Sequence, residues 1–286
     1  MKPAPFEYLA ADTLDQAVAL LQDRGAEAKL LAGGQSLVPL MNLRLARPQS
    51  LIDLNPAKEL AYVREQDGAL TIGAMTRHHH VASSGLIREH APLLAAAAAN
   101  IGFPAIRHRG TIGGSCAHAD PAAEMPLVAL ALGATFVVAS SRGVRRLPAD
   151  GFFVSHLTTA LEPDEVLSEV TFPKPPKSDG WAFEELSRKA GDFVTVAVAV
   201  QVSVANGRVG RLEVALAGVA ERPLKVPTGE LSGRILDEAF YGEIAERAGQ
   251  LVAGPANGHG ADDRAQVVRV LTERAVRRAV ATAGQG

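Results

Sequence analysis

The sequence predicts a mixed α and β protein built from two domains. The chain has 286 residues, which is more than most single domains contain. Some segments repeat apolar residues at helical spacing, whereas others are short apolar runs bounded by Gly, Asn or Asp, which is typical of strands. Residues 173–180 contain three prolines and a glycine, and such a segment continues neither a helix nor a central strand. We therefore expect one domain over residues 1–175 and a second over 176–286.

Composition and charge exclude several classes of protein. The formal net charge is −2, and this near-neutral balance argues against a protein whose main partner is nucleic acid. The longest apolar stretches, around residues 93–99 and 194–200, are far shorter than the roughly 20 residues of a transmembrane helix. No signal-peptide pattern is visible, so we expect a cytoplasmic protein without a transmembrane segment. The single cysteine, Cys116, excludes an internal disulfide and a cysteine-ligated zinc or iron–sulfur site within this chain.

The N-terminal segment predicts a compact βαβ-like unit. Thr13 and Gln16 have the capping-box spacing, in which the hydroxyl accepts from a free backbone N–H group and the amide reaches back to the cap. Apolar residues at helical spacing follow, and Gly25 is a suitable helix end. Beyond this helix we expect a strand over residues 29–32, a short helix over 36–43 and a strand over 50–54.

Three hairpins and several helices are predicted in the rest of the chain. Asp67-Gly68 and Asn206-Gly207 accept the positive φ of a tight turn, so the runs on either side of each pair should form antiparallel strands. Thr76 is placed to cap a helix through three histidines. We expect hairpin strands over residues 62–65 with 69–73, 135–139 with 144–147 and 194–204 with 212–219, and helices over 92–100, 122–132, 236–252 and 263–283, the last two separated by the glycine-rich residues 254–260.

Two glycine-rich turns are the strongest candidates for a binding site. They are Ala32-Gly33-Gly34-Gln35-Ser36-Leu37 and Thr111-Ile112-Gly113-Gly114-Ser115, and each follows an apolar segment. Paired glycines let successive backbone N–H groups converge on one point, because no Cβ blocks positive φ or close approach. Hydroxyl groups in both turns supply further donors. Two such turns fit the two phosphates of a dinucleotide, clamped from opposite sides.

A purely structural interpretation of the two turns stays open. Short glycine motifs match by chance, so each pair on its own is also compatible with a tight connection. Other phosphate-binding motifs do not match: the sequence has no Gly-Lys-Ser/Thr of a P-loop and no strand-linked Gly-x-Gly-x-x-Gly of a Rossmann site. A nucleotide site at these turns therefore belongs to another fold.

Polar residues elsewhere give weaker signals. His118, Asp120 and Glu124 match no closed metal-site spacing, so we reject a metal site there. Adjacent helical residues project about 100° apart, so the three histidines at residues 78–80 are expected on the surface rather than around one ion. Cys116 is interpreted as a small packed residue. No residue set resembles a hydrolytic triad, a paired-carboxylate site or a covalent flavin attachment point, so redox chemistry in this chain requires a bound organic cofactor.

In their order along the chain, these motifs resemble one known family. The two turns, residues 120–124 (Asp-Pro-Ala-Ala-Glu), residues 187–193 (Ser-Arg-Lys-Ala-Gly-Asp-Phe) and residues 217–223 (Ala-Gly-Val-Ala-Glu-Arg-Pro) resemble the FAD-binding medium subunit of molybdenum hydroxylases, the carbon monoxide dehydrogenase and xanthine dehydrogenase family. The likeness covers nearly the whole chain. The ordered combination is far more specific than either glycine pair alone.

The resemblance implies a fold of the α+β class. It is the two-subdomain FAD-binding fold of the vanillyl-alcohol oxidase (PCMH) type, followed by a smaller C-terminal α+β domain of antiparallel strands and helices. The subdomains would span about residues 1–55 and 56–175, and the C-terminal domain residues 176–286. The cofactor would be FAD.

The resemblance also implies a set of cofactor-binding residues and no catalytic or metal-binding side chain. In the family the two turns hold the FAD pyrophosphate, and the position of Ile101 lies against the flavin. Glu124 matches an acidic position, usually Asp, near the adenosine part, and residues 166–167 match a backbone edge by the ring. The implied residues are Ala32, Gly33, Gly34, Gln35, Ser36, Leu37, Ile101, Thr111, Gly114, Ser115, Glu124, Val166 and Leu167.

Two positions depart from the family pattern. A lysine that relatives carry near the flavin is absent, and Glu184-Glu185 occupy that stretch. Phe193 stands where some relatives carry Tyr. The tuning of the flavin and the choice of external acceptor therefore stay open.

The family relationship further implies partner subunits. Relatives oxidise substrate at a molybdenum cofactor on a large molybdopterin-binding subunit, and electrons cross two [2Fe–2S] clusters on a small subunit to reach FAD. FAD then passes them to an external acceptor such as a quinone, NAD⁺ or dioxygen. We expect a heterotrimer that dimerises to a hexamer. The alternatives are a stand-alone FAD-dependent oxidase or reductase of the same fold and a non-enzymatic assembly module.

Overall fold

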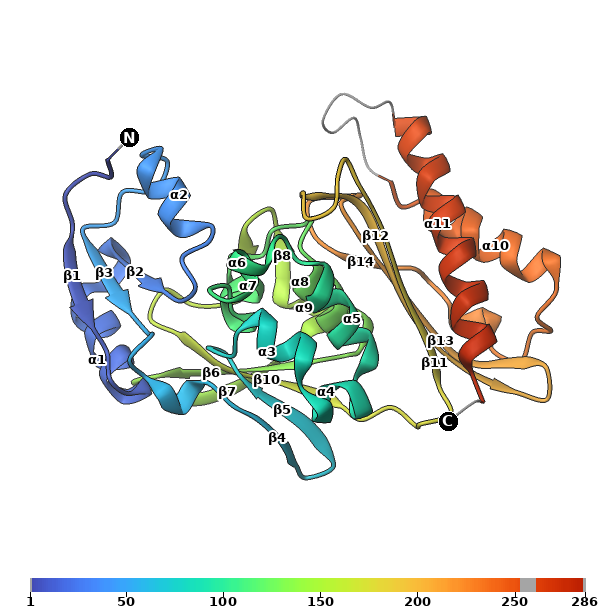
Figure 1. Ribbon diagram of the computed structural model, residues 1–286, viewed down its shortest axis with the longest axis horizontal. Coiled ribbons are helices and arrows are strands. Elements are labelled where there is room, and N and C mark those ends of the chain that lie inside the picture. The colour runs from blue at the N-terminus through green and yellow to red at the C-terminus, as the bar shows by residue number, and fades with distance from the viewer. Residues whose placement is uncertain (1, 253–260, 285–286) are drawn as a thin grey trace.

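The computed structural model describes residues 2–252 and 261–284 of the chain. Three main β-sheets follow one another along the long axis of the molecule, each with helices packed on it (Figure 1). The N-terminal sheet has three strands, the central sheet five and the C-terminal sheet four, while β8 (Phe153–Ser155) and β9 (Thr158–Thr159) form a separate pair. The mixed α and β content predicted from the sequence is confirmed.

The N-terminal lobe is a small parallel sheet in the order β1-β3-β2. The predicted βαβ-like unit is confirmed, since β2 (Ala28–Leu31) and β3 (Ser50–Asp53) are parallel and α2 (Leu37–Asn42) lies between them in the chain. Strand β1 (Glu7–Ala10) was not expected, because its side chains are mostly exposed. Its pairing with β3, in the register Glu7↔Ser50, places it in the sheet through backbone hydrogen bonds instead of a hydrophobic pattern.

Helix α1 (Leu14–Arg24) begins and ends where the sequence predicts. The Thr13 hydroxyl accepts from the Gln16 N–H at 3.2 Å, as in a capping box. The Gln16 amide oxygen, however, accepts from the backbone of Asp12 at 2.8 Å, one residue before the cap. The buried face of α1 packs against the N-terminal sheet and against β6 and β10 of the central sheet. The N-terminal lobe is therefore attached to the centre of the molecule through this helix.

The central sheet has the order β4-β5-β10-β6-β7 and is antiparallel throughout. Two predicted hairpins are confirmed, and the strand between them, β10, was not predicted. It pairs with β5 through Val170↔Ile72 and with β6 through Val170↔Phe136. The strands are β4 (Val63–Gln66), β5 (Ala69–Gly73), β6 (Thr135–Ser140), β7 (Gly143–Pro148) and β10 (Val166–Pro173).

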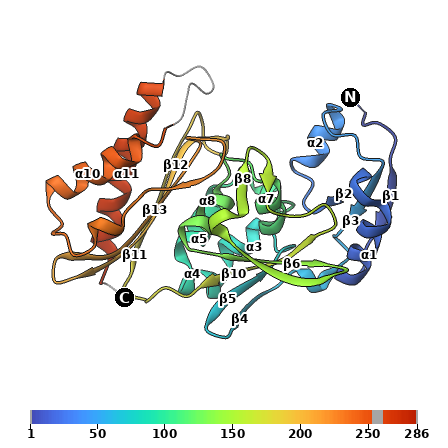
Figure 2. The same cartoon turned by 180° about the vertical axis from the view of Figure 1, so that it is seen from behind.

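Short helices cover one face of the central sheet (Figures 1 and 2). The predicted helices at residues 92–100 and 122–132 are present as α5 and the slightly shorter α8, and both are rich in buried residues. Helices α4 and α6 were not predicted, because each is only one or two turns long. The helices are α3 (His78–Ser83), α4 (Gly85–His90), α5 (Pro92–Asn100), α6 (Pro104–Arg107), α7 (Ile112–His118), α8 (Glu124–Ala131) and α9 (Ala149–Phe152), with 3₁₀ turns η1 (Gly25–Glu27) and η2 (Lys58–Leu60) earlier in the chain.

Two expectations about α3 are wrong. Its N-cap is Arg77, not Thr76, and the Thr76 hydroxyl donates instead to the carbonyl of Tyr62 at 2.9 Å. The expectation of three surface histidines holds for His79 and His80 but not for His78, which is only 4% exposed. The pKa of His78 is lowered to about 4, chiefly by burial and also by the charges of Arg77 and Arg107. The position of α3 under the second glycine turn decided this burial.

The C-terminal sheet has the order β11-β12-β13-β14, and the hairpin at Asn206-Gly207 is confirmed. Two predicted helices cover one of its faces as α10 and α11, and the segment between them lies outside the described residues. Among the residues described, each helix is too short or too polar to span a bilayer. The elements are β11 (Gly180–Ser187), β12 (Val194–Ala205), β13 (Arg208–Ala217), β14 (Leu224–Lys225), η3 (Gly229–Leu231), α10 (Glu238–Gly249) and α11 (Ala261–Thr282).

The C-terminal sheet is fixed to the rest of the molecule by close packing. On its second face α8 contacts β12 and β13, and α5 contacts β11 (Figures 1 and 2). Gly180 begins β11 directly beneath α11, where an added Cβ would lie 1.9 Å from the Ala279 carbonyl oxygen and 2.8 Å from the Ala283 nitrogen. Only glycine allows the backbone after the proline-rich segment to pass this close to the last helix.

We expect Gly180→Ala to destabilise the protein by about 1–3 kcal/mol or more, because the added methyl group meets backbone atoms that have no rotamer to change. The control is Gly242→Ala in α10, where no atom lies within 4 Å of the added Cβ. This control should leave stability unchanged or raise it by up to about 1 kcal/mol. Urea unfolding of both variants measures the difference. Equal stability of the two would contradict the close contact.

Candidate functional site

The two glycine turns lie against each other in the structure. An added Cβ on Gly33 would lie 2.5 Å from the carbonyl oxygen of Arg109 and 2.6 Å from the Cα atom of Gly110. An added Cβ on Gly114 would lie 3.2 Å from the Cβ atom of Ala32. Segments about 80 residues apart in sequence, one from the N-terminal lobe and one from the central part, are thus in backbone contact. The prediction that these turns form one site is consistent with this geometry.

The first turn presents a row of free hydrogen-bond donors. Gly34 adopts a left-handed conformation with φ of 75°, and the chain then enters α2. Within residues 2–252 and 261–284, none of the backbone N–H groups of residues 33–37 donates a hydrogen bond. The hydroxyl group of Ser36 is exposed and does not cap the helix. Successive free N–H groups of this kind form a concavity suited to phosphate oxygens.

The second turn has a different local structure from the one expected. Its glycines lie in the first turn of α7, and Thr111 is the N-cap, accepting from the Gly114 N–H at 3.1 Å. The N–H groups of Ile112 and Gly113 donate to the carbonyls of Thr76 and Ala74. Gly113 is required for packing, since an added Cβ would lie 2.4 Å from the Cβ of Ala74. This turn therefore contributes a surface without side chains, and the hydroxyl groups of its two ends, rather than a row of free donors.

Ile101 lies at the C-terminal end of α5, beside a loop that the structure holds tightly. The guanidinium of Arg107 donates to the carbonyls of Ile101 at 2.9 Å and of Gly102 at 2.8 Å. The loop around Gly191 packs against this segment, with 3.1 Å between an added Cβ and the Gly102 carbonyl. Phe193, on that second loop, is 77% exposed. Two of the segments that the resemblance places by the flavin are thus adjacent in space.

At Val166 and Leu167, the groups that a ligand could contact belong to the backbone and not to the side chains. Both side chains are buried, in two different hydrophobic clusters. The residues pair with β6 through Val166↔Ala139 and Leu167↔Val138, whereas the ladder with β5 begins only at Glu169. Among the described residues, the opposite edge of residues 166–167 therefore has no strand partner, which is compatible with the backbone edge that the resemblance implies.

Glu124 is the first residue of α8 and lies in an acidic environment. Its pKa is raised to about 7, chiefly by burial; a hydrogen bond from its own backbone opposes this, and the charges of Glu185 and Asp120 add to the rise. Burial also raises the pKa of Glu185, whose Oε2 atom has no hydrogen-bond partner among the described residues. Glu184 instead pairs with Arg278 at 3.1 Å. At the stretch where relatives carry a lysine, this chain thus has one paired and one buried carboxyl group.

The cysteine and the possible metal ligands among the described residues do not form a site. Cys116 is fully buried in α7, and burial raises the pKa of its thiol, so it is the packed residue expected from the sequence. In the part of the chain that the structure describes, no three His, Cys, Asp or Glu side chains gather closely enough to hold a metal ion.

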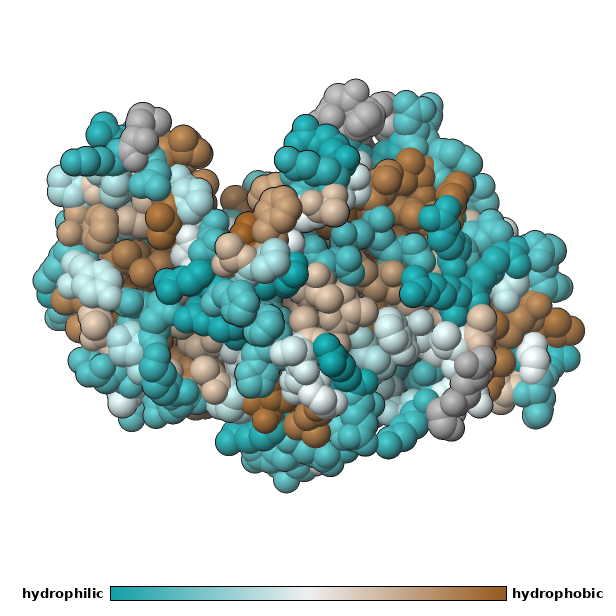
Figure 3. Space-filling view, viewed as in Figure 1, coloured by the Kyte–Doolittle hydropathy of each residue, from teal (hydrophilic) through white to brown (hydrophobic). Residues whose placement is uncertain are grey.

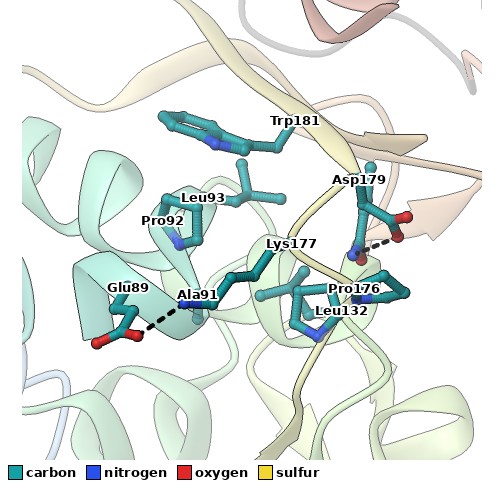
Figure 4. Close-up of a pocket in the computed structure, with 11 residues that line it drawn as sticks. Glu89, Ala91, Pro92, Leu93, Leu132, Pro176, Lys177, Asp179 and Trp181 are labelled. Carbon is teal, nitrogen blue, oxygen red and sulfur yellow. Dashed lines mark hydrogen bonds and ion pairs between the residues drawn. The ribbon is translucent and has the colours of Figure 1, made fainter. Parts of the chain in front are cut away.

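The best-formed cavity lies away from the glycine turns. It has a volume of about 230 Å³ and sits where the proline-rich segment meets α5 and β11, with Trp181 over Pro92 and Leu93 and with the Lys177–Glu89 ion pair at its rim (Figure 4). None of the residues implied by the resemblance lines it. The space-filling view instead shows an open cleft between the N-terminal lobe and the centre of the molecule, with hydrophobic side chains on both walls (Figure 3).

Sequence reasoning missed two residues at the turns, Asn55 and Arg77. Asn55 Nδ2 donates to the Ala32 carbonyl at 2.9 Å, and Arg77 donates to the Arg109 carbonyl. Asn55 lies two residues after the end of a fully buried strand, and polar residues just beyond strand ends are candidates for such a role. Nothing in the spacing of Arg77, however, indicates a partner in the N-terminal lobe.

Comparison with known proteins identifies the two parts of the chain. Residues 4–175 match the model of the FAD-binding domain in molybdopterin dehydrogenase, and residues 181–279 match that of the CO dehydrogenase flavoprotein C-terminal domain. The chain is 40% identical to the 6-hydroxypseudooxynicotine dehydrogenase complex subunit alpha of Paenarthrobacter nicotinovorans, over 98% of this chain and 96% of that protein. It is 42% identical to the carbon monoxide dehydrogenase medium chain of Hydrogenophaga pseudoflava, over 87% of this chain and 86% of that protein.

Solved structures agree with these relationships. Carbon monoxide dehydrogenase from Hydrogenophaga pseudoflava, in a form that lacks the Mo-pyranopterin moiety of its cofactor, superposes with a TM-score of 0.96 at 39% identity, covering 99% of this chain and 100% of that one. Quinoline 2-oxidoreductase from Pseudomonas putida 86 gives 0.93 at 36% identity, covering 99% of each chain. The predicted fold, an FAD-binding domain followed by a C-terminal domain, is confirmed. The chain belongs to the family of FAD-binding medium subunits of molybdopterin dehydrogenases, and it is a flavoprotein subunit of oxidoreductase type with FAD as its cofactor.

Proposed function

We propose that this chain is the FAD-carrying electron-transfer subunit of a molybdenum hydroxylase. In this role it accepts electrons from [2Fe–2S] clusters of a partner subunit and passes them to an external acceptor. The observation that carries the proposal is the row of N–H groups at residues 33–37 that donate no hydrogen bond in the described structure, in a turn that lies in contact with the second glycine turn. A diphosphate is the group that two such turns fit.

The residues proposed to hold FAD have separate tasks. The N–H groups of the first turn donate to phosphate oxygens, and the absence of a Cβ at Gly33 and Gly114 lets the backbone come close. Ile101 provides an apolar surface for the ring, and the free backbone edge at residues 166–167 provides hydrogen bonds beside it. The complete proposed set is Ala32, Gly33, Gly34, Gln35, Ser36, Leu37, Ile101, Thr111, Gly114, Ser115, Glu124, Val166 and Leu167.

Bound FAD supplies the redox chemistry, and no side chain of this chain is proposed as a catalytic acid or base. The protein's own residues bind FAD, orient it and shield it from water. The buried carboxyl group of Glu124 can retain a proton near neutral pH, because burial raises its pKa to about 7. A protonated Glu124 adds no negative charge next to Glu185, which limits repulsion of an anionic ligand.

The assembly that we propose contains partner subunits. A large molybdopterin-binding subunit and a small [2Fe–2S] subunit complete a cytoplasmic heterotrimer, which dimerises to a hexamer. The relatives named above as a dehydrogenase complex subunit and as a medium chain support this proposal. Within the chain we propose FAD-binding subdomains over residues 1–55 and 56–175 and a C-terminal domain over 176–286.

The first test of the function is flavin binding by the purified full chain. We expect protein-bound FAD that absorbs in the visible range and is released on denaturation. A colourless chain that takes up no added FAD would contradict the proposal. Turnover of a small organic substrate by the chain without partners would favour a stand-alone oxidase or reductase instead.

We expect Gly114→Val to weaken FAD binding by about 10-fold or more, because its Cβ would lie 2.7 Å from the Thr111 hydroxyl of its own turn and 3.2 Å from the Cβ atom of Ala32 in the first turn, and the branched side chain would push the turns apart. Absorbance of the purified protein and titration of the apoprotein with FAD measure the change. The control is Gly85→Ala in α4, where no atom lies within 4 Å of the added Cβ. Full flavin occupancy in Gly114→Val would show that this turn does not hold FAD.

The stability of the chain without FAD should fall as pH rises through the range in which Glu124 ionises. The pKa of Glu124 is about 7 when folded, against a usual value of 4.5, so its contribution is fully present below about pH 4.5 and is lost as pH rises through about 7. The loss is up to about 3 kcal/mol. Glu124→Gln should remove this part of the pH dependence in urea unfolding at pH 5 and pH 8, whereas Glu221→Gln, at an exposed residue, should not. Identical profiles for wild type and Glu124→Gln would contradict the assignment.

A further inference from the structure

A hydrogen-bonded chain of polar groups connects the two glycine turns behind their contact surface. It begins at the first turn, where the Asn55 amide donates to the carbonyl of Ala32 at 2.9 Å. Asn55 follows the end of β3, so it belongs to the N-terminal lobe. Its amide oxygen accepts from Nη2 of Arg77 at 2.5 Å.

Arg77 completes the connection to the second turn. Its Nη1 atom donates to the carbonyl of Arg109, the same carbonyl that an added Cβ on Gly33 would meet. The Arg77 backbone forms an antiparallel bridge with Thr111, and the next residue donates its N–H to the Gly110 carbonyl at 3.0 Å. One guanidinium group therefore reaches the second turn directly and the first turn through one amide.

The N-terminal end of this chain of contacts is held in place. The Asp53 carboxylate accepts from the backbone N–H of Asn55 at 2.9 Å and from its side-chain amide. The Tyr8 hydroxyl donates to the same carboxylate at 2.6 Å. Asp53 is 9% exposed, whereas Tyr8 is 55% exposed, so the carboxylate itself is buried and its tyrosine partner lies at the surface. The Asn55 side chain thus has a fixed orientation, with its oxygen toward Arg77.

The contacts of the Arg77 guanidinium group depend on its planar shape rather than on its charge. Among residues 2–252 and 261–284, no carboxylate lies within ion-pair distance of Arg77, and its side-chain bonds go to a carbonyl and an amide oxygen. A planar group with several donors in fixed directions can bond two acceptors on different segments at once. A lysine carries the same charge on a flexible stem and cannot reproduce this fork.

We propose that Arg77 is a positioning residue for FAD: together with Asn55 it sets the separation of the two glycine turns and so determines FAD affinity without contacting the cofactor. The inference rests on the proposed function, because it assumes that the two turns hold the diphosphate. It assigns a role to a pair of residues outside the cofactor-binding set.

The test compares FAD dissociation constants of full-chain variants at a temperature where circular dichroism shows each one to be folded. We expect Arg77→Met, Arg77→Lys and Asn55→Ala each to weaken FAD binding by on the order of 10-fold, since mutations outside a site change coupling by this amount. The double variant Arg77→Met/Asn55→Ala should bind no more weakly than either single variant, because the two residues act as one unit. Arg88→Met, which removes an arginine bonded within the α3–α4 segment, should bind as wild type does.

Several results would overturn the inference. Wild-type affinity in Arg77→Lys would show that charge alone matters, and additive losses in the double variant would show that Asn55 and Arg77 act separately. Wild-type affinity in Arg77→Met would exclude any role in binding. If Arg77→Met does not fold, Arg77→Lys and Asn55→Ala still decide the question. Failure of the wild-type chain itself to bind FAD would overturn the proposed function and this inference together, whereas binding by wild type and all variants alike would overturn the inference only.

Discussion

The backbone contact between the two glycine turns is the constraint on which the site depends. The N-terminal lobe and the central part of the chain meet where the Gly33 Cα comes close to the main chain of residues 109–110. Any side chain at Gly33 would occupy the space of a carbonyl oxygen, so the lobes can approach this closely only through glycine. The space-filling view shows a cleft between the N-terminal lobe and the centre of the molecule (Figure 3). A ligand that lies on both turns is therefore bound by both lobes at once.

The two turns share a sequence pattern but have different physical roles. The first is a loop with a left-handed glycine and five consecutive backbone N–H groups, residues 33–37, that donate no bond in the described structure. The second is the start of a helix in which Gly113 is fitted against Ala74, the residue after β5, and Gly114 lies near Ala32 of the first turn. Hydrogen-bonding capacity thus comes mainly from the first turn, and close approach comes from both. A polar connection through Asn55 and Arg77 ties them together from behind.

A buried cysteine and an acidic pair lie among the residues around the site. The chain's one cysteine is buried, and among the described residues no cluster is suited to a metal ion. The acidic pair Glu124 and Glu185 lies in a buried setting in which the pKa of each carboxyl group is raised. Helix α8, which begins with Glu124, also packs on the C-terminal sheet, so the environment of this carboxyl group depends on both parts of the chain.

Sequence alone determined the features that depend on neighbouring residues. The capped helix after Thr13, the hairpins at Asp67-Gly68 and Asn206-Gly207, and the alanine-rich α5 follow from local hydrogen bonding, turn geometry and periodicity. The glycine turns and the ordered motifs also indicate the family. These signals lie within short segments of the chain, which is why they can be recognised without a fold.

Tertiary structure alone decided which distant segments meet. Strand β10 enters the sheet between two hairpins because edges of both were open, and no local pattern specifies that partner. His78 is buried because α3 packs under the second turn, although its neighbours His79 and His80 are exposed. The connection from Ala32 through Asn55 and Arg77 to Arg109 likewise joins four separate segments. The physical reason is the same in each case: burial and hydrogen-bond partners are properties of the packed chain, and a residue acquires them only when segments remote in sequence come together.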